Sequence, residues 1–511
     1  MPFDTQQAVL EFLARPATHG LAPTTPIEVI RTHISVVILA GARAFKLKRA
    51  VALPYLDHTT LQAREACCRH EVAINRLTAP GLYEGVIAVT RDPKGELALG
   101  GTGLVVEWLV VMHRFPQEAL FDHLASQGRL DRHQMCDLAE AVHAAHNQAE
   151  RITTRPDWLA RILDNSLTSL ESQAERLGAD RAAALAAALR AEATARAPLL
   201  AERAAAGFVR RCHGDLHLGN IVLWQDRPTL FDAVEFNDLF VEIDVLYDLA
   251  YLVMDLHIHA PRRLASILFN HYMEFAGDTA GLALLPLFLA LRATIRAFVR
   301  ATAAAGQTDP AEAQRLETEA RDYLDHARAF LAPQPPRLVA VGGLSGSGKS
   351  RLARELACFL GRAPGALVLR TDVLRKRLMG LTPYQPLGPE GYTPEVHARV
   401  YQTLEAEARL ALAVGQSVVL DGVHAKPPER ANAERMAAEA GVPFDGLWVH
   451  TPVTVALNRI ETRVRNPSDV TPSVRANQEA FDLGAVTWTR IDASGPKEET
   501  VAKGVRALGL G

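Results

Sequence analysis

The sequence predicts two domains, an α+β domain at residues 1–332 followed by an α/β domain with a parallel sheet at residues 333–511. In the longer part, strand-like runs come first and helical runs second, which is typical of an α+β arrangement. In the shorter part, apolar strands alternate with helical stretches, the pattern of βαβ units in a parallel sheet. Three prolines near 333–336 separate the two parts, because proline cannot continue a helix and favours extended backbone.

The elements of the first part follow from its residue pattern. Two β-rich runs flank "AGAR" within residues 26–50 and predict a hairpin. Turn residues "DPKGE" interrupt a second β-rich region at 84–112. Residues 130–206 are rich in alanine, the best helix former, so we expect packed helices there rather than a disordered tract. The other expected elements are a helix at 60–78, strands at 221–231 and helices from there to about 330.

Four apolar runs predict the parallel sheet of the second part. They read "RLVAVGG", "ALVLRTD", "QSVVLDGV" and "FDGLWVHT". The linker that precedes the first of them is expected at about 331–337.

The composition excludes some classes of protein. The 511 residues carry a formal net charge of −3, so the whole chain has no general affinity for nucleic acid or for an anionic membrane. From Pro333 onward there are 22 Lys+Arg against 18 Asp+Glu, a balance that suits an anionic nucleotide. The N-terminal residues lack a signal-peptide pattern, and no apolar run reaches ~18 residues without a charge, so we expect a cytoplasmic protein without a membrane span. The five cysteines form no C-x-x-C pair, which agrees with a reducing compartment.

The stretch "GLSGSGKS" at residues 343–350 carries the strongest functional signal. It fits G-x-x-x-x-G-K-[ST] at each fixed position, between an apolar strand and a helix. Glycines let backbone N–H groups turn onto phosphate oxygens, and a helix N-terminus favours anions. We expect Lys349 to reach the β- and γ-phosphates of a nucleotide and Ser350 to hold Mg²⁺. The predicted nucleotide-binding residues are Gly343, Ser345, Gly346, Ser347, Gly348, Lys349 and Ser350.

Two acids further along are candidates for phosphoryl-transfer chemistry. Asp372 ends the predicted strand in "LVLRTDVLRKRL", where it could accept a proton from an attacking hydroxyl; the alternative is a helix N-cap. Arg375 and Arg377 follow within one helical turn and could bind an anionic substrate or remain solvated. Asp421 ends the apolar strand in "SVVLDGVH" and is expected to support Mg²⁺.

The stretch "NRIETRVRNPSDVT" supplies Arg459, Arg463 and Arg465. The first two are spaced i, i+4 and share one face of a helix. A mobile lid could bring them onto the phosphates and neutralise charge in the transition state. The alternative is a solvated basic helix.

Residues 337–511 resemble the small P-loop kinases represented by zeta toxins, gluconate kinase, chloramphenicol phosphotransferase and the kinase domain of polynucleotide kinases. The resemblance rests on "GLSGSGKS", "RTDVLRKR", "VVLDGV" and the arginine-bearing stretch. It implies an ATP-dependent kinase in which Asp372 binds the acceptor hydroxyl. The sequence contains no N-K-x-D motif for guanine, which favours ATP over GTP.

A second phosphate-handling signature, "HGDLHLGN", lies far upstream at residues 213–220. Asp215 and Asn220 reproduce the D-x-x-x-x-N spacing of protein kinases, in which the Asp is the base and the Asn binds Mg²⁺. Asp232 follows the second of two strands, as the further Mg²⁺ ligand does in those enzymes. Oxygen-bearing side chains gathered at one place are best explained by a metal that offsets their repulsion.

This stretch resembles the aminoglycoside phosphotransferase and choline kinase family, whose fold is related to that of protein kinases, over roughly residues 25–330. The resemblance implies a strand lysine on the ATP phosphates, with Lys46 as first choice and Lys48 as competitor, and Glu71 as its ion-pair partner. It also implies an interlobe hinge from Glu107 to Met112 whose backbone binds adenine. The nucleotide loop departs from the family pattern, since only "AGAR" stands where G-x-G-x-x-G is expected.

Together the two halves resemble bacterial fusions of a phosphotransferase-like domain with an ATP-binding domain. We therefore predict an ATP- and Mg²⁺-dependent kinase that moves the γ-phosphate to a hydroxyl acceptor, taken here to be a small molecule. One alternative is a 5′-hydroxyl polynucleotide kinase, which needs a basic groove leading to Asp372 and binds in a salt-sensitive way. The other is a P-loop kinase regulated by an N-terminal domain that binds nucleotide without transferring phosphate.

Overall fold

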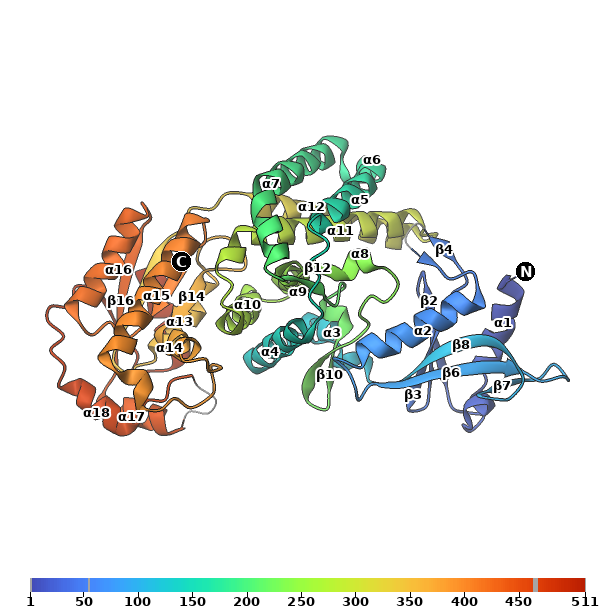
Figure 1. The fold of residues 1–511 in the computed structure, drawn as a ribbon, viewed down its shortest axis with the longest axis horizontal. Helices are drawn as coiled ribbons and strands as arrows, with labels where there is room; N and C mark the ends of the chain where they lie inside the picture. Colours follow the sequence, from blue (N-terminus) through green and yellow to red (C-terminus); the bar gives the residue numbers. More distant parts are fainter. Residues whose placement is uncertain (1, 54–55, 463–466, 511) are drawn as a thin grey trace. The chain divides into compact units, whose positions relative to one another are not determined.

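The fold is taken from a computed structural model that describes residues 2–53, 56–462 and 467–510 (Figure 1). The chain divides into two compact units, Met1–Asn165 with Ala197–Asp255, and Ser166–Arg196 with Leu256–Gly511. No helix within the described residues is both long and apolar enough to cross a membrane.

The first unit begins with an antiparallel sheet that has a helix on each face. Its elements are α1 (Pro2–Leu13), β1 (Ile27–Arg31), β2 (Ser35–Ala40), β3 (Arg43–Lys48), β4 (Ala52–Leu53), β5 (Leu56–Asp57), α2 (Leu61–Asn75), β6 (Tyr83–Arg91), β7 (Leu97–Leu99) and β8 (Leu104–His113). The strand order is β1-β2-β3-β8-β6-β7. The predicted hairpin is confirmed: β2 and β3 pair around Gly41, whose φ of 58° is strained for other residues. Leu13 of α1 packs on one face of the sheet, and Val72 of α2 packs on the other.

A mainly helical part follows in the same unit. Its elements are α3 (Phe121–Ser126), α4 (Arg132–Gln148), β9 (Val209–Arg211), η3 (Leu218–Asn220), β10 (Ile221–Trp224), β11 (Arg227–Leu230), α8 (Asp238–Val241), β12 (Glu242–Asp244) and α9 (Val245–His259). β9 pairs with β12, and β10 pairs with β11. The segment 212–220 connects β9 to β10, so both ends of "HGDLHLGN" are anchored in strand ladders.

The alanine-rich stretch folds as the packed helices that its composition predicts. The helices are α5 (Trp158–Ser172), α6 (Ala174–Leu177) and α7 (Ala179–Ala205). Leu185 and Leu189 of α7 are buried. Helices α5 and α7, and the last turn of α9, cross from one unit into the other along the chain.

The second unit contains the predicted parallel sheet, which has a fifth strand, β17, beyond the four that the sequence indicates. Its elements are α10 (Arg262–Ala276), α11 (Leu285–Ala305), α12 (Pro310–Leu331), β13 (Leu338–Gly342), α13 (Lys349–Ala357), β14 (Leu367–Arg370), α14 (Thr371–Leu378), η5 (Pro389–Tyr392), α15 (Pro394–Ala413), β15 (Val418–Asp421), α16 (Pro427–Glu439), β16 (Phe444–His450), α17 (Val453–Thr462), α18 (Pro472–Glu479), β17 (Thr489–Asp492) and α19 (Lys497–Ala507). The strand order is β14-β15-β13-β16-β17. The central strands read as continuous apolar runs because helices bury both faces of a parallel sheet. Ligands of such sheets bind at the carboxyl ends of the strands.

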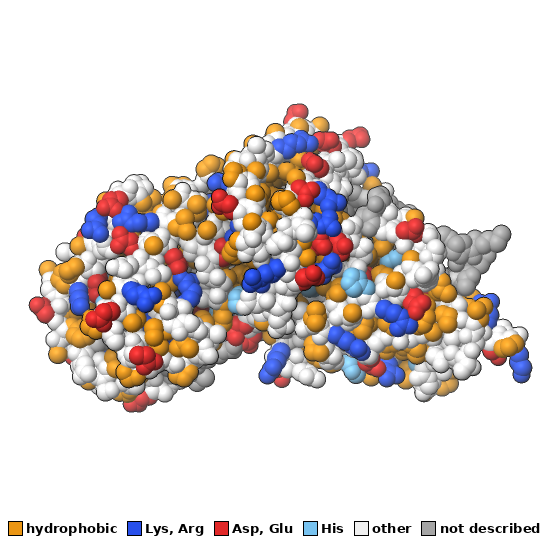
Figure 2. Space-filling model, viewed as in Figure 1, with side chains coloured by type: hydrophobic (Ala, Val, Ile, Leu, Met, Phe, Trp, Pro, Cys, Tyr) orange, Lys and Arg blue, Asp and Glu red, His pale blue; other side chains and the backbone are white. Residues whose placement is uncertain are grey.

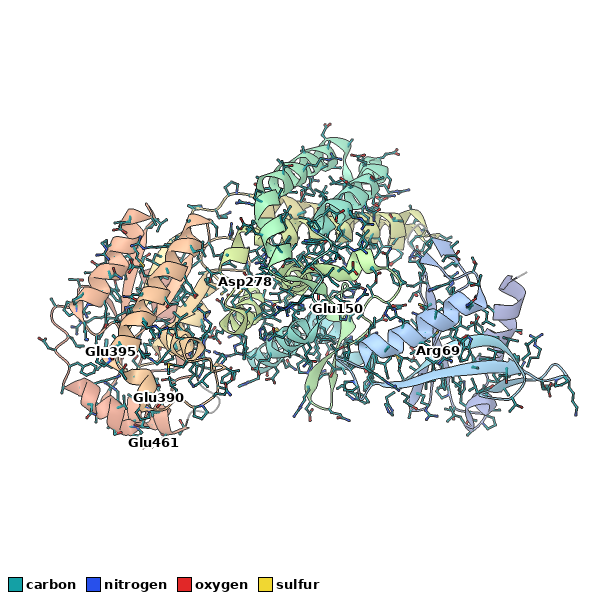
Figure 3. The ribbon with its side chains drawn as sticks, viewed as in Figure 1. Arg69, Glu150, Asp278, Glu390, Glu395 and Glu461 are labelled. Atoms are coloured by element: carbon teal, nitrogen blue, oxygen red, sulfur yellow. The ribbon has the colours of Figure 1, made fainter. Side chains whose placement is uncertain are left out.

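Helix α10 covers the edge of this sheet at β14. The amide of Val368 donates to Oδ1 of Asn270 at 2.7 Å, and Nδ2 of Asn270 donates to the carbonyl oxygen of Ala366 at 3.1 Å. These bonds satisfy edge-strand backbone groups that would otherwise be open. Beyond the helix, Asp278 (labelled in Figure 3) accepts a hydrogen bond from the amide of Gly281 at 3.1 Å. The sheet that follows the proline linker thus uses a helix that precedes it in the sequence.

Candidate active sites

The glycine-rich stretch 343–350 connects β13 to α13, where the sequence places it. Gly343, Gly346 and Gly348 all have φ values in the region that side chains rarely adopt. A Cβ at Gly346 would lie 2.7 Å from the carbonyl oxygen of Ala456. Gly346 therefore lets the loop pack closely against α17. Lys349 is the first residue of α13, so the loop ends at a helix N-terminus that attracts anions.

Asp421 is the last residue of β15 and is only 3% exposed. Nε of Arg370 donates to its Oδ2 at 3.2 Å, whereas Oδ1 has no hydrogen-bond partner among the described residues. The buried hydroxyl of Ser347 in the phosphate loop also has none there. Leaving such an atom unpaired costs about 1–3 kcal/mol, which a bound ion or ligand would offset. Carboxylate and hydroxyl oxygens from Asp421 and Ser350 are the donor set that suits Mg²⁺.

Asp372 is half-buried and lies in the first turn of α14. The interpretation that it ends a strand is wrong, because β14 stops at Arg370 and the helix begins at once. Arg375 is buried, donates Nη1 to the carbonyl oxygen of Gly391 at 2.8 Å, and keeps Nε without a partner in the part of the chain that the structure describes. Arg377 forms an ion pair with Glu407 of α15.

Arg459 contacts the phosphate loop through a backbone oxygen of Ser347. Its Nη1 donates to the carbonyl oxygen of Ser347 at 3.3 Å, and its Nη2 donates to that of Ala493 at 2.8 Å. Arg463 and Arg465 lie outside the described residues. Of the predicted pair Arg459 and Arg463, the structure therefore describes only Arg459.

Sequence reasoning missed Arg475 of α18. The residue is 3% exposed and forms an ion pair with Glu479, while its Nε and Nη1 have no partner within the described ranges. One turn further on, Oε1 of Gln478 accepts a hydrogen bond from the amide of Ser345 at 2.8 Å, which brings α18 against the phosphate loop. The signal in the sequence was an arginine in a short helix just after the predicted lid.

His424, three residues after Asp421, was also missed. It is 1% exposed, and neither ring nitrogen has a partner in the described part of the protein. Burial lowers its pKa to about 4, so the imidazole is neutral at neutral pH and offers one donor and one acceptor. Its φ of 48° is a strained backbone conformation of the kind that clusters at functional sites.

The first unit has a pocket that distinguishes Lys46 from Lys48. Lys46 and Asp232 line it together with apolar side chains that include Leu39 and Met112. Nζ of Lys46 lies 2.9 Å from Glu71 Oε1 and also pairs with Asp232. These carboxylates outweigh the effect of burial and raise the pKa of Lys46 well above its usual value.

Lys48 is fully buried and pairs with Glu71 and Glu235. It does not line the pocket. The lysine that faces the pocket is therefore Lys46.

Two residues of "HGDLHLGN" contact each other, Asp215 and Asn220. Nδ2 of Asn220 donates to Oδ2 of Asp215 at 3.0 Å and to its carbonyl oxygen at 2.9 Å. Asp232 has a φ of 59° and its amide donates to the hydroxyl of Tyr83 at 3.1 Å. The charges of both Asp215 and Asp232 act on the buried His213, although burial dominates and lowers the pKa of that ring. These oxygen-bearing side chains fit a Mg²⁺ site, and their roles stay predictions.

The structure does not bring Glu107 to this pocket. The residue lies inside β8, which pairs with β3 on one side and β6 on the other. Its carboxylate accepts hydrogen bonds from Arg64 at 2.9 Å and from Gln6 at 2.8 Å. Glu107 is therefore held inside the sheet, whereas Met112, at the other end of the predicted hinge, lines the pocket. The role of 107–112 as a hinge stays a prediction.

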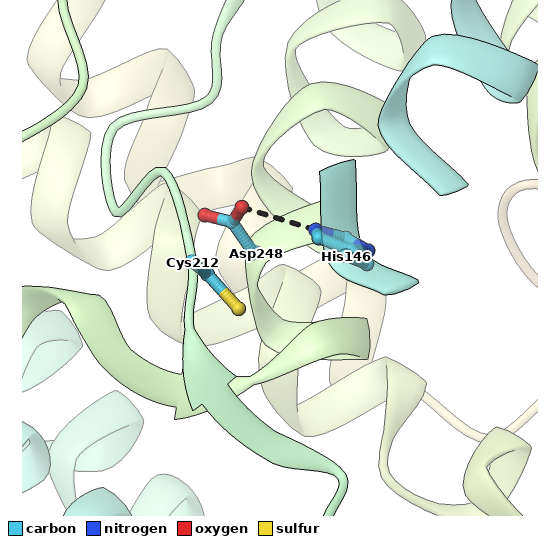
Figure 4. A group of neighbouring side chains, drawn as sticks. All are labelled: His146, Cys212 and Asp248. Carbon is cyan, nitrogen blue, oxygen red and sulfur yellow. Dashed lines mark hydrogen bonds and ion pairs between the residues drawn. The ribbon is translucent and has the colours of Figure 1, made fainter. Parts of the chain in front are cut away.

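Asp248 of α9 holds the loop 212–220 in place, and sequence reasoning missed it. Its Oδ1 accepts a hydrogen bond from the amide of Gly214 at 2.9 Å, and its Oδ2 accepts one from the amide of His213 at 3.2 Å. His146 and Cys212 lie beside it, with possible ligand atoms within 4.8 Å of one another (Figure 4). Since both carboxylate oxygens already bind the loop, the group is explained as support for it. The signal was a lone acid near the start of a very apolar helix.

Comparisons with known proteins match both parts of the chain to family models. A phosphotransferase enzyme family model matches residues 86–285, and an AAA domain model matches residues 338–482. An uncharacterized protein of Mycobacterium tuberculosis (strain ATCC 25618 / H37Rv) is 32% identical over 497 residues, which cover 95% of this chain and 96% of that protein. An adenylyl-sulfate kinase of Myxococcus xanthus is 33% identical over 118 residues, 23% of this chain and 59% of that enzyme. The solved structure of a choline/ethanolamine kinase family protein from Mesorhizobium loti covers 65% of this chain and 99% of its own, at 16% identity and a TM-score of 0.37.

Proposed function

The chain belongs to a family of two-domain kinases that join a phosphotransferase domain to a P-loop kinase domain, and we propose that its P-loop site phosphorylates a hydroxyl group of a small anionic molecule. The enzyme is an ATP-dependent kinase. The identity of the acceptor and the roles of single residues are parts of this proposal.

One observation carries the proposal. Several buried polar atoms without a partner in the described part of the chain gather around the carboxyl ends of the parallel strands. They belong to Ser347, Arg375, Asp421, His424 and Arg475. Native proteins rarely bury polar atoms unpaired, and such groups call for a ligand or ion. The mixture of acids, bases and hydroxyls suits a phosphorylated nucleotide with its metal and an acceptor.

ATP with Mg²⁺ supplies the phosphoryl group when it is bound. Lys349 would hold the phosphates, and Ser350 and Asp421 would hold the metal. The carboxylate of Asp372 would take the proton of the acceptor hydroxyl. Lys349 would stabilise the transition state, because a fixed cation interacts most strongly where negative charge develops during the reaction.

Arginines on three elements complete the proposed site. Arg459 donates to the phosphate loop, and Arg475 lies on the helix that Gln478 connects to this loop. Both arginines would neutralise charge on the transferring group. Arg375 pairs with no carboxylate among the described residues, and its guanidinium lies 5.0 Å over the ring of Tyr392. A buried guanidinium held in this way favours an acceptor that carries a carboxylate or phosphate group.

We propose that the site in the first unit is a second catalytic centre. Lys46 and Glu71 would orient the nucleotide phosphates, Asp215 would serve as base, and Asn220 and Asp232 would hold Mg²⁺. The strained φ of Asp232 supports a functional role, since strain of this kind persists where the site needs it.

The polynucleotide alternative gains no support from the visible surface. On the face shown in Figure 2, Lys and Arg side chains are interspersed with Asp and Glu side chains. A kinase of 5′-hydroxyl ends needs a basic path for the phosphate backbone.

The test is transfer of labelled γ-phosphate from ATP to a panel of sugars, sugar acids, nucleosides, aminoglycosides and 5′-hydroxyl oligonucleotides. The full chain would be compared with Lys349→Ala, Asp215→Ala and the control Lys94→Ala, which changes an exposed turn lysine. A product lost only with Lys349→Ala assigns the chemistry to the P-loop site. A product lost only with Asp215→Ala refutes the proposal for the P-loop site. Oligonucleotide products alone would replace the small-molecule acceptor.

A further inference from the structure

We propose that Glu274 of helix α10 is a positioning residue for metal binding at the P-loop site, where it acts through Arg370 on Asp421. This inference rests on the function proposed for that site. Glu274 lies within residues 86–285, which match the phosphotransferase model, whereas Asp421 lies in the stretch that matches the AAA domain. A residue of one family domain would therefore serve the catalytic site of the other.

The contacts form a buried row of three charges. Nη1 of Arg370 donates to Oε1 of Glu274 at 2.8 Å, and its Nε donates to Oδ2 of Asp421 at 3.2 Å. All three side chains are at most 6% exposed. Burial raises the pKa of Glu274, but Arg370 and a hydrogen bond to His271 more than reverse this and hold the pKa well below its usual value. Glu274 is thus ionised, and one guanidinium is shared by two carboxylates.

Helix α10 also supports the chain on the acceptor side. Nδ1 of His271 lies 2.8 Å from Oε2 of Glu274, and its Nε2 lies 3.2 Å from the hydroxyl of Tyr384. Tyr384 belongs to the segment that follows α14, the helix that carries Asp372. A continuous row of polar contacts therefore runs from this segment through α10 to the proposed metal ligand.

The shared guanidinium explains why one oxygen of Asp421 stays open. Because Glu274 takes one edge of Arg370, only Nε reaches Asp421, and Oδ1 has no partner among the described residues. Without the charge of Glu274, Asp421 would be the remaining carboxylate partner of Arg370 in this row. The positive charge of Arg370 would then compete with a divalent cation for the carboxylate of Asp421. Residues that orient metal ligands from behind typically change metal affinity 10–100-fold when replaced. We expect Glu274→Gln to weaken metal binding about 10-fold.

Mn²⁺ binding in the presence of a non-hydrolysable ATP analogue tests this directly. Free Mn²⁺ would be measured by electron paramagnetic resonance with the full chain carrying Asp232→Asn, which weakens the other predicted metal site. The matched control is Glu407→Gln, which also breaks a partly buried glutamate–arginine pair, that with Arg377, but does not contact Asp421. We expect weaker Mn²⁺ binding with Glu274→Gln and wild-type binding with Glu407→Gln.

A double variant keeps the test decisive if Glu274→Gln folds poorly. Glu274→Gln combined with Arg370→Gln removes the competing cation together with its partner, so Mn²⁺ binding should return at least to the wild-type level. Equal Mn²⁺ binding by wild type and Glu274→Gln would overturn the inference, and so would weak binding by the double variant. Lys349→Ala should abolish the nucleotide-dependent Mn²⁺ binding; if it has no effect, the proposed P-loop function itself fails.

Discussion

Two lysines on one face of β3 should separate nucleotide binding from stability. Lys48 is enclosed by Glu71 and Glu235, whose side chains are 0% and 4% exposed. Replacing Lys48 by methionine removes the cation that pairs with the buried carboxylates of Glu71 and Glu235. Such a loss typically lowers the free energy of unfolding by about 3–5 kcal/mol. Lys46→Met should cost about 1 kcal/mol or less, because Asp232 is 38% exposed and Glu71 keeps Lys48. Lys46→Met should instead lose nucleotide binding, since it removes the cation that faces the pocket.

Two measurements on the same samples check this contrast. Hydrogen exchange of peptides from 43–48 and 61–75 reports the free energy of opening β3 and α2. A fluorescent ATP analogue, used in a Lys349→Ala background, reports binding in the first unit. Greater loss of protection with Lys46→Met than with Lys48→Met would refute the reasoning. So would loss of binding with Lys48→Met while protection stays intact.

Three further predictions concern the second unit and the loop 212–220. The pKa of His424 is about 4 when folded and near 6.5 when unfolded, so the unfolded chain binds more protons and the free energy of unfolding falls by about 3 kcal/mol from pH 6.5 to 4. His424→Gln should flatten this pH dependence in urea unfolding, and an unchanged slope would contradict the assignment. A fragment 333–511 should melt below a fragment 256–511, because loss of the two Asn270 hydrogen bonds alone costs about 2 kcal/mol; equal melting temperatures would contradict this. Asp248→Asn should lower Asp215-dependent turnover at least about 10-fold, since an amide offers one acceptor oxygen where the loop amides use two; turnover within about 2-fold of wild type would contradict it.

The phosphate loop could be predicted because its physics is local. A loop that turns onto phosphate needs glycines at fixed spacing, and a strand and a helix must flank it in sequence. The parallel sheet followed in the same way from the alternation of apolar and helical runs. Arg475 could not be predicted, because its helix reaches Ser345 through Gln478, a contact that spans 133 residues of chain. No spacing rule encodes a partner so far away.

Contacts inside the fold explain why Glu107 does not lie at the pocket. The run around Glu107 combines apolar residues with one acid, as an interlobe hinge can. The sequence alone does not reveal that this run lies in β8, between β3 and β6 in the sheet. The choice between Lys46 and Lys48 was open for a related reason. Residues two apart share a strand face, so only the depth of each side chain in the fold distinguishes them.

The proline linker is a boundary in the sequence but not in the packing. Residues 256–331 precede it and yet belong to the same compact unit as the parallel sheet. Asn270 binds the backbone of β14, and Glu274 binds Arg370 beside Asp421, so α10 contributes both to the fold and to the proposed chemistry of the P-loop kinase. A P-loop kinase that could be cut out at the prolines would have no need of these contacts. Helix α10 lies in the stretch that matches the phosphotransferase family model, and it nevertheless packs as part of the unit that contains the P-loop.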